Sequence, residues 1–69
     1  MSAMETKVHS ELNRMSHTGV RRFFGYHVHI CACNLRSTDA EVYAAVFSLA
    51  QRGKITPLPG RKTMFEISA

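Results

Sequence analysis

The feature that most constrains this fold is a strongly marked helix followed at once by two short strands. Thr38 and Glu41 have the spacing of a capping box, in which each side chain bonds the backbone N–H of the other residue. The apolar residues that follow recur at helical spacing, namely Val42, Ala45, Val46 and Leu49. Gly53 stands where helices commonly end. The pattern predicts a helix over 38–52.

The segment after Gly53 predicts a β-hairpin. Residues 54–56 and 63–67 alternate in polarity, as half-buried strands do. The connection over 57–62 contains two prolines and one glycine, which are typical of an exposed turn. We therefore expect two short strands joined by an exposed tip.

An earlier helix is predicted over residues 4–16. Ser2 and Glu5 again have capping-box spacing. The apolar positions Met4, Val8, Leu12 and Met15 lie on one helical face. Thr18 and Gly19 form a plausible end to this helix.

The middle of the chain is ambiguous. Residues 20–27 suggest an extended connection, with a short strand near 26–28. In the run 27–35, a strand would place both histidines and both cysteines on one face, namely His27, His29, Cys31 and Cys33. A helix would instead align Val28, Cys31, Ala32 and Leu35. We favour a short helix, because the residues that follow require one in that register.

The resulting order of helix, short helix, capped helix and hairpin predicts an α+β fold, a winged helix-turn-helix with three helices and a C-terminal β-hairpin wing. Small and apolar residues occupy the positions at which such helices pack, namely Ala32, Leu35, Val42, Val46, Leu49, Gly53 and Ile55. The 69 residues suffice for one domain over 1–69, which could be a piece of a larger protein.

Residues 41–55, EVYAAVFSLAQRGKI, resemble the third helix of Z-alpha domains, winged helices that recognise left-handed DNA and RNA. The segment FSLAQRGKI is similar to the family's Tyr-Ser-Leu-Ala-Lys-Lys-Gly-Lys-Leu run. The resemblance covers about residues 27–67 without a gap and places Phe65 where the family has tryptophan. It implies the winged-helix fold and a nucleic-acid-binding surface.

The chain departs from the Z-alpha pattern at the positions that read the left-handed duplex. Tyr43 replaces the family's asparagine, and Phe47 replaces its tyrosine. Other replaced positions are Asp39 and Ala40 for two lysines, Ala44 for an arginine, and Arg61, Lys62 and Thr63 for the wing's Thr-Pro-Pro. The resemblance therefore does not carry over left-handed specificity. We expect a Z-alpha-like domain whose Z-form preference has changed or been lost.

Charge favours a polyanionic partner. The formal net charge is +4, and residues 52–62 contain four cations and no acid. Aromatic side chains can stack on exposed bases, while lysine and arginine can neutralise phosphates. The candidate nucleic-acid-binding residues are Tyr43, Phe47, Lys54, Arg61, Lys62, Thr63, Phe65 and Arg36. The ligand could be DNA or RNA, and single-stranded RNA is as plausible as a duplex. Phe47 and Phe65 could instead serve packing, and Arg61 and Lys62 could form an ordinary solvated turn.

A different function remains open. Five aromatic residues could form a protein-interaction or dimerisation surface, since aromatics are enriched at interface cores, namely Phe23, Phe24, Tyr26, Tyr43 and Phe47. A dimeric DNA-binding repressor is a further alternative. Binding to nucleic acid should weaken steeply with salt, whereas an aromatic protein interface should not.

Other classes are not supported. The sequence contains no catalytic motif, so we expect no enzyme activity and no cofactor. Four alternating His and Cys residues on a strand would lie too far apart for one zinc ion, so we expect no metal site. The cysteines at 31 and 33 are too close for an ordinary disulfide, and we expect Cys31 to be buried. No signal peptide or membrane span is visible, so we expect an intracellular protein with no membrane partner.

Overall fold

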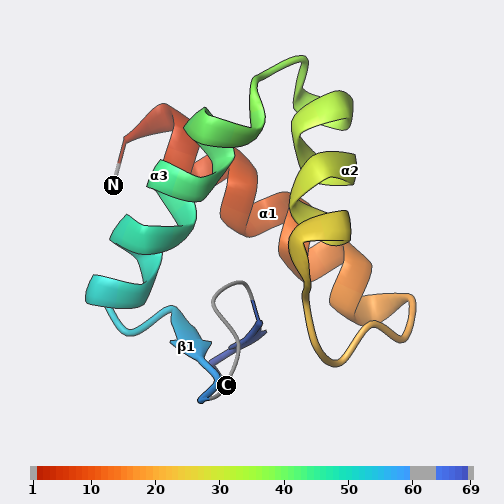
Figure 1. Cartoon of the computed structure of the whole chain (residues 1–69), viewed down its shortest axis with the longest axis vertical. Helices are drawn as coiled ribbons and strands as arrows, with labels where there is room; N and C mark the ends of the chain where they lie inside the picture. Colours follow the sequence, from red (N-terminus) through yellow and green to blue (C-terminus); the bar gives the residue numbers. More distant parts are fainter. Residues whose placement is uncertain (1, 60–63, 69) are drawn as a thin grey trace.

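A computed structural model of the chain describes residues 2–59 and 64–68. It contains three helices followed by a two-stranded antiparallel sheet, an α+β arrangement in the predicted order (Figure 1). The elements are α1 (Ala3–His17), α2 (Gly25–Leu35), α3 (Asp39–Gln51), β1 (Ile55–Pro57) and β2 (Phe65–Ile67). In Figure 1, α1 crosses between α3 and α2, and the hairpin lies below them. No helix in the described part is long and apolar enough to cross a membrane.

Both predicted capping boxes are confirmed. The backbone N–H of Glu5 donates to Ser2 Oγ at 3.1 Å, and that of Glu41 donates to Thr38 Oγ1 at 3.2 Å. In return, Thr38 N–H donates to Glu41 Oε1 at 3.0 Å. These bonds satisfy backbone donors that have no partner within the helix. They explain why α1 and α3 begin at the residues that the sequence indicates.

The helix predicted over 27–35 is confirmed as α2, but the strand predicted near 26–28 is wrong. Those residues belong to the first turn of α2, where the N–H of Phe24 donates to Nδ1 of His27 at 3.0 Å. The extended pairing lies earlier, at Phe23. Its N–H and C=O exchange hydrogen bonds with Phe65 at 2.8 and 3.1 Å. The helix thus begins directly after its N-cap Phe24, and Phe23, one residue earlier, bridges to β2.

The turn between α2 and α3 depends on Arg36, which has left-handed backbone angles of φ 54° and ψ 43°. Its N–H bonds the carbonyl of Cys33 at 3.2 Å, and Ser37 N–H bonds that of Ala32 at 2.8 Å. These bonds end α2 and redirect the chain, so that α3 begins only three residues later.

The hairpin differs slightly from the prediction, because β1 lies one residue later than expected and Met64 lies outside β2. β1 pairs with β2 in the register Ile55 with Ile67, Thr56 with Glu66 and Pro57 with Phe65. Gly53 ends α3 as expected, with a positive φ of 75°, and Lys54 N–H then bonds the carbonyl of Leu49 at 2.9 Å. Of the predicted connection over 57–62, Pro57 belongs instead to β1, while residues 60–63, which include Arg61, Lys62 and Thr63, lie outside the described residues.

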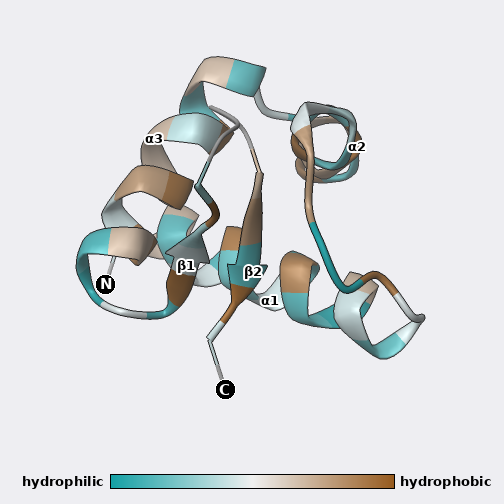
Figure 2. Cartoon of the chain, turned by 60° about the horizontal axis from the view of Figure 1, so that its bottom comes forward, coloured by the Kyte–Doolittle hydropathy of each residue, from teal (hydrophilic) through white to brown (hydrophobic). Residues whose placement is uncertain are grey.

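One core joins all five elements. Its buried apolar members are Val8, Leu12, Met15, Phe23, Val28, Cys31, Ala32, Val42, Ala45, Leu49, Ile55 and Phe65. Leu35 and Val46, also expected in the core, are partly buried against it. Phe23 and Phe65 stack with ring centroids 5.3 Å apart. Figure 2 shows that α3 is largely apolar along its length, with hydrophilic residues at its two ends.

Candidate functional site

The outer face of α3 displays two aromatic rings. Tyr43 and Phe47 lie one helical turn apart and are 36% and 66% exposed. The same helix buries Val42, Ala45 and Leu49 on its inner face. These inner residues make the contacts of α3 with the core, and the exposed side chain of Phe47 lies outside that core. Tyr43 and Phe47 therefore add exposed aromatic surface to the outer face of α3.

A groove of about 550 Å³ lies between α3 and the hairpin. Apolar side chains predominate in its walls, which are formed by Tyr43, Ala44, Val46, Phe47, Ala50, Ile55, Pro57, Met64 and Phe65. Both exposed rings of α3 therefore border the same depression. A flat ring of a base or an apolar side chain of a protein would suit such a wall.

The cations flank α3 rather than lying on it. Arg36 is exposed in the turn before the helix, and Lys54 is exposed just after it. The residues of α3 include two acids, Asp39 and Glu41, and no lysine or arginine. The helix itself therefore carries no cation.

The structure brings together only part of the predicted site. Tyr43, Phe47 and Phe65 border one groove, but Phe65 is only 4% exposed and mainly serves the core. Arg36 and Lys54 lie at opposite ends of α3. The structure does not describe three further predicted site residues, namely Arg61, Lys62 and Thr63.

Arg52 is occupied by an ion pair. Its Nε donates to Glu5 Oε2 at 3.0 Å, joining the end of α3 to the start of α1. Burial alone would raise the pKa of Glu5, but the hydrogen bonds from Ser2, the charge of Arg52 and a bond from Ser48 together lower it below its usual value. This cation therefore stabilises the fold, although sequence reasoning grouped it with the basic segment.

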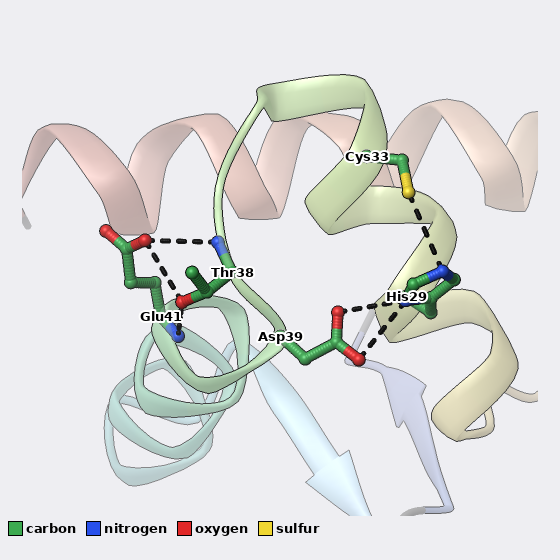
Figure 3. Close-up of polar contacts among 5 residues, drawn as sticks. All are labelled: His29, Cys33, Thr38, Asp39 and Glu41. Atoms are coloured by element: carbon green, nitrogen blue, oxygen red, sulfur yellow. Dashed lines mark hydrogen bonds and ion pairs between the residues drawn. The ribbon is translucent and has the colours of Figure 1, made fainter.

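A second polar cluster, which sequence reasoning missed, joins α2 to α3 (Figure 3). Nδ1 of His29 lies 3.1 and 3.2 Å from the two carboxylate oxygens of Asp39. Nε2 of the same ring lies 3.7 Å from Sγ of Cys33. The helical spacing of His29 and Cys33 was visible in the sequence, but the approach of Asp39 depends on the turn at Arg36.

The cluster does not have the form of a metal centre. Asp39 and Cys33 approach opposite nitrogens of the His29 ring, so the three side chains do not converge on one point (Figure 3). Within residues 2–59 and 64–68, no group of three or more His, Cys, Asp or Glu side chains could hold a metal ion.

Comparison with protein families, curated proteins and solved structures finds no match to this chain.

Proposed function

We propose that this chain is a winged helix-turn-helix domain of Z-alpha-like type that binds nucleic acid without catalysing a reaction. The order of three helices and a hairpin supports the winged-helix assignment. The observation that carries the function is the exposed pair Tyr43 and Phe47 on the groove beside the hairpin. In a winged helix, this face of the third helix is the one that meets nucleic acid.

The chemistry of this face favours unpaired bases. Tyr43 and Phe47 offer rings for stacking, which is worth about 1–3 kcal/mol per base. The acids at the start of α3 would repel a phosphate backbone that lay along the helix. Arg36 and Lys54 could instead hold phosphates on either side of a stacked segment. A single strand or a locally unpaired loop, of RNA or DNA, fits this arrangement better than a regular duplex.

Fluorescence anisotropy with a labelled AU-rich single-stranded RNA tests this proposal. The double variant Tyr43→Ala with Phe47→Ala should weaken binding at least tenfold, because two stacking contacts are lost. Tyr26→Ala is the matched control, since Tyr26 is 69% exposed but does not line the groove. Equal affinities for the two variants would contradict the proposed site.

A parallel titration tests whether recognition of left-handed duplexes survives. The domain is added to a CG-repeat duplex and the circular dichroism of the nucleic acid is recorded. We expect no inversion of the spectrum, because Tyr43 and Phe47 replace the residues that read the left-handed form in the resembling family. Inversion would establish Z-form binding despite these replacements.

Protein binding is the second candidate, and the apolar lining of the groove is the observation that favours it. Salt separates the two functions. Binding to nucleic acid should fall steeply as salt is raised, and Lys54→Glu or the pair Arg61→Glu with Lys62→Glu should weaken it. A groove that binds an apolar protein segment should retain its affinity under both changes.

A further inference from the structure

The cluster on the outer side of α2 has the geometry of an activated thiol. Cys33 and His29 lie one helical turn apart, and Asp39 meets the ring from the first residue of α3 (Figure 3). The side chains of His29 and Asp39 are 65% and 50% exposed, and Cys33 is exposed as well. A small solute can therefore reach the sulfur.

The carboxylate determines which nitrogen of His29 carries the proton. An ionised aspartate only accepts hydrogen bonds, so Nδ1–H donates to Asp39. In the neutral ring, Nε2 then has a free lone pair, and it is this nitrogen that faces Sγ of Cys33 at 3.7 Å. The Cys33 thiol thus donates to a base that is already oriented to receive its proton.

The other cysteine provides an internal contrast. Cys31 is fully buried in the core, two residues away on the same helix. Burial, with a smaller effect from Glu11, raises the pKa of its thiol to about 11. One helix therefore carries an inert thiol on its inner face and a thiol paired with a base on its outer face.

We propose that Cys33 is a selectively reactive thiol that forms mixed disulfides with low-molecular-weight disulfides. The proton of Cys33 moves to Nε2 of His29, and the thiolate attacks one sulfur of the disulfide R–S–S–R. A Cys33–S–S–R bond forms, the R–S–S–R bond breaks, and R–S⁻ leaves and takes up a proton. His29 acts as the base, and Asp39 is a positioning residue. This inference is independent of the proposed nucleic-acid binding.

The reaction of the folded protein with the aromatic disulfide 5,5′-dithiobis(2-nitrobenzoic acid) tests the proposal. At pH 7 we expect one equivalent of thiolate to be released rapidly and a second only after unfolding in denaturant. Cys33→Ser should remove the rapid phase, whereas Cys31→Ala should keep it. Rapid reaction of Cys31, or no rapid phase in the wild-type protein, would overturn the assignment.

Replacing His29, the proposed base, tests whether Cys33 reacts because of His29 or only because its thiol is exposed. His29→Gln should slow the rapid phase about threefold to tenfold at pH 7, because the ring nitrogen that accepts the thiol proton is lost. The difference should narrow at pH 9, where hydroxide can take the place of this base. His17→Gln removes an exposed histidine of α1 and should change nothing. Equal rates for His29→Gln and the wild-type protein would show that Cys33 is exposed but not activated.

Two substitutions test whether the negative charge of Asp39 is needed for the reaction. Asp39→Asn should slow the reaction at pH 7, and Asp39→Glu, which keeps the charge, should react faster than Asp39→Asn. Circular dichroism of each variant verifies that α3 still forms.

Glutathione disulfide then serves as a non-aromatic probe, with the adduct located by peptide mass spectrometry. An adduct at Cys33 is expected, and its absence after reaction of the aromatic probe would limit the site to activated disulfides and refute the general proposal.

Discussion

Cys31 shows how the position of one side chain sets a pH dependence for the whole fold. The folded protein holds the thiol proton until pH about 11, whereas an exposed thiol of the unfolded chain loses it near pH 9. Between these values the unfolded state binds fewer protons, so the free energy of unfolding should fall as the pH rises. Below pH 9 this contribution is constant.

Urea unfolding at pH 8, 9 and 10 checks this prediction. The wild-type protein should lose stability more steeply than Cys31→Ala, which lacks the buried thiol but retains every other side chain. Cys33→Ala keeps the buried thiol and should therefore retain the loss of stability between pH 9 and pH 10. Parallel curves for the wild-type protein and Cys31→Ala would contradict the assignment.

Arg36 combines backbone strain with a predicted binding role. Its φ of 54° lies in the left-handed region, which costs a residue with a Cβ atom about 1–2 kcal/mol. Arg36→Gly should relieve this strain and stabilise the domain by about 0.5–1 kcal/mol, after the greater entropy of glycine in the unfolded chain is offset. Thermal unfolding measures the gain.

Arg36→Ala is the matched control for this change. Alanine keeps the strained Cβ atom and should give no gain in stability. Both variants lose the same cation, so under the proposed function they should weaken nucleic-acid binding equally. If Arg36→Gly is more stable and binds nucleic acid with wild-type affinity, Arg36 is strained in the turn but does not contribute to binding.

At the scale of elements, the capping box of α3 holds the start of the helix that borders the groove. Thr38→Ala should destabilise the domain by about 1 kcal/mol, because Glu41 N–H loses its acceptor. This corresponds to a decrease of roughly 4–8 °C in melting temperature for a chain of this size. Thr38→Ser keeps the hydroxyl and should remain close to the wild-type protein. Equal melting temperatures for all three would show that the box contributes nothing.

The predictability of the helices follows from how local their signals are. The starts of α1 and α3 could be predicted because a cap and its partner lie three residues apart. The start of α2 could not, because its N-cap is Phe24, which has no capping side chain, and the sequence resembles a strand as much as a helix. The pairing of Phe23 with Phe65 spans most of the chain, and periodicity carries no signal for contacts of that length.

The same contrast between local and long-range signals applies to the candidate site. Tyr43 and Phe47 could be placed together from helical spacing alone, and the structure confirms that both are exposed. The burial of Phe65 and the pairing of Arg52 with Glu5 depend on elements distant in sequence. The approach of Asp39 to His29 depends on one left-handed residue, which no pattern of polarity reveals.

For the molecule as a whole, Phe65 has the widest role. It stacks on Phe23, bonds its backbone and pairs with β1, so it ties the connection between α1 and α2 to the hairpin. Truncation of a buried phenylalanine costs about 3–5 kcal/mol, and a domain of this length has a total stability of roughly 3–10 kcal/mol.

Phe65→Ala should therefore leave much of the protein unfolded at 25 °C, which far-UV circular dichroism would detect. Phe65→Leu keeps most of the buried volume and should remain folded with a lower melting temperature. Phe47→Ala removes the same side chain from an exposed position and should leave stability almost unchanged. A cooperative, wild-type-like transition for Phe65→Ala would show that the core does not depend on this ring.

The bridge at Phe23 also affects whether another strand could pair with the edges of this sheet. Because Phe65 directs its N–H and C=O toward Phe23, its partner Pro57 turns its own backbone outward, to the free edge of β1. A proline there offers no donor to an incoming strand, while the other edge of β2 is occupied at Phe65 by Phe23. At the Pro57–Phe65 position, neither edge of the hairpin therefore offers a free backbone donor to another strand.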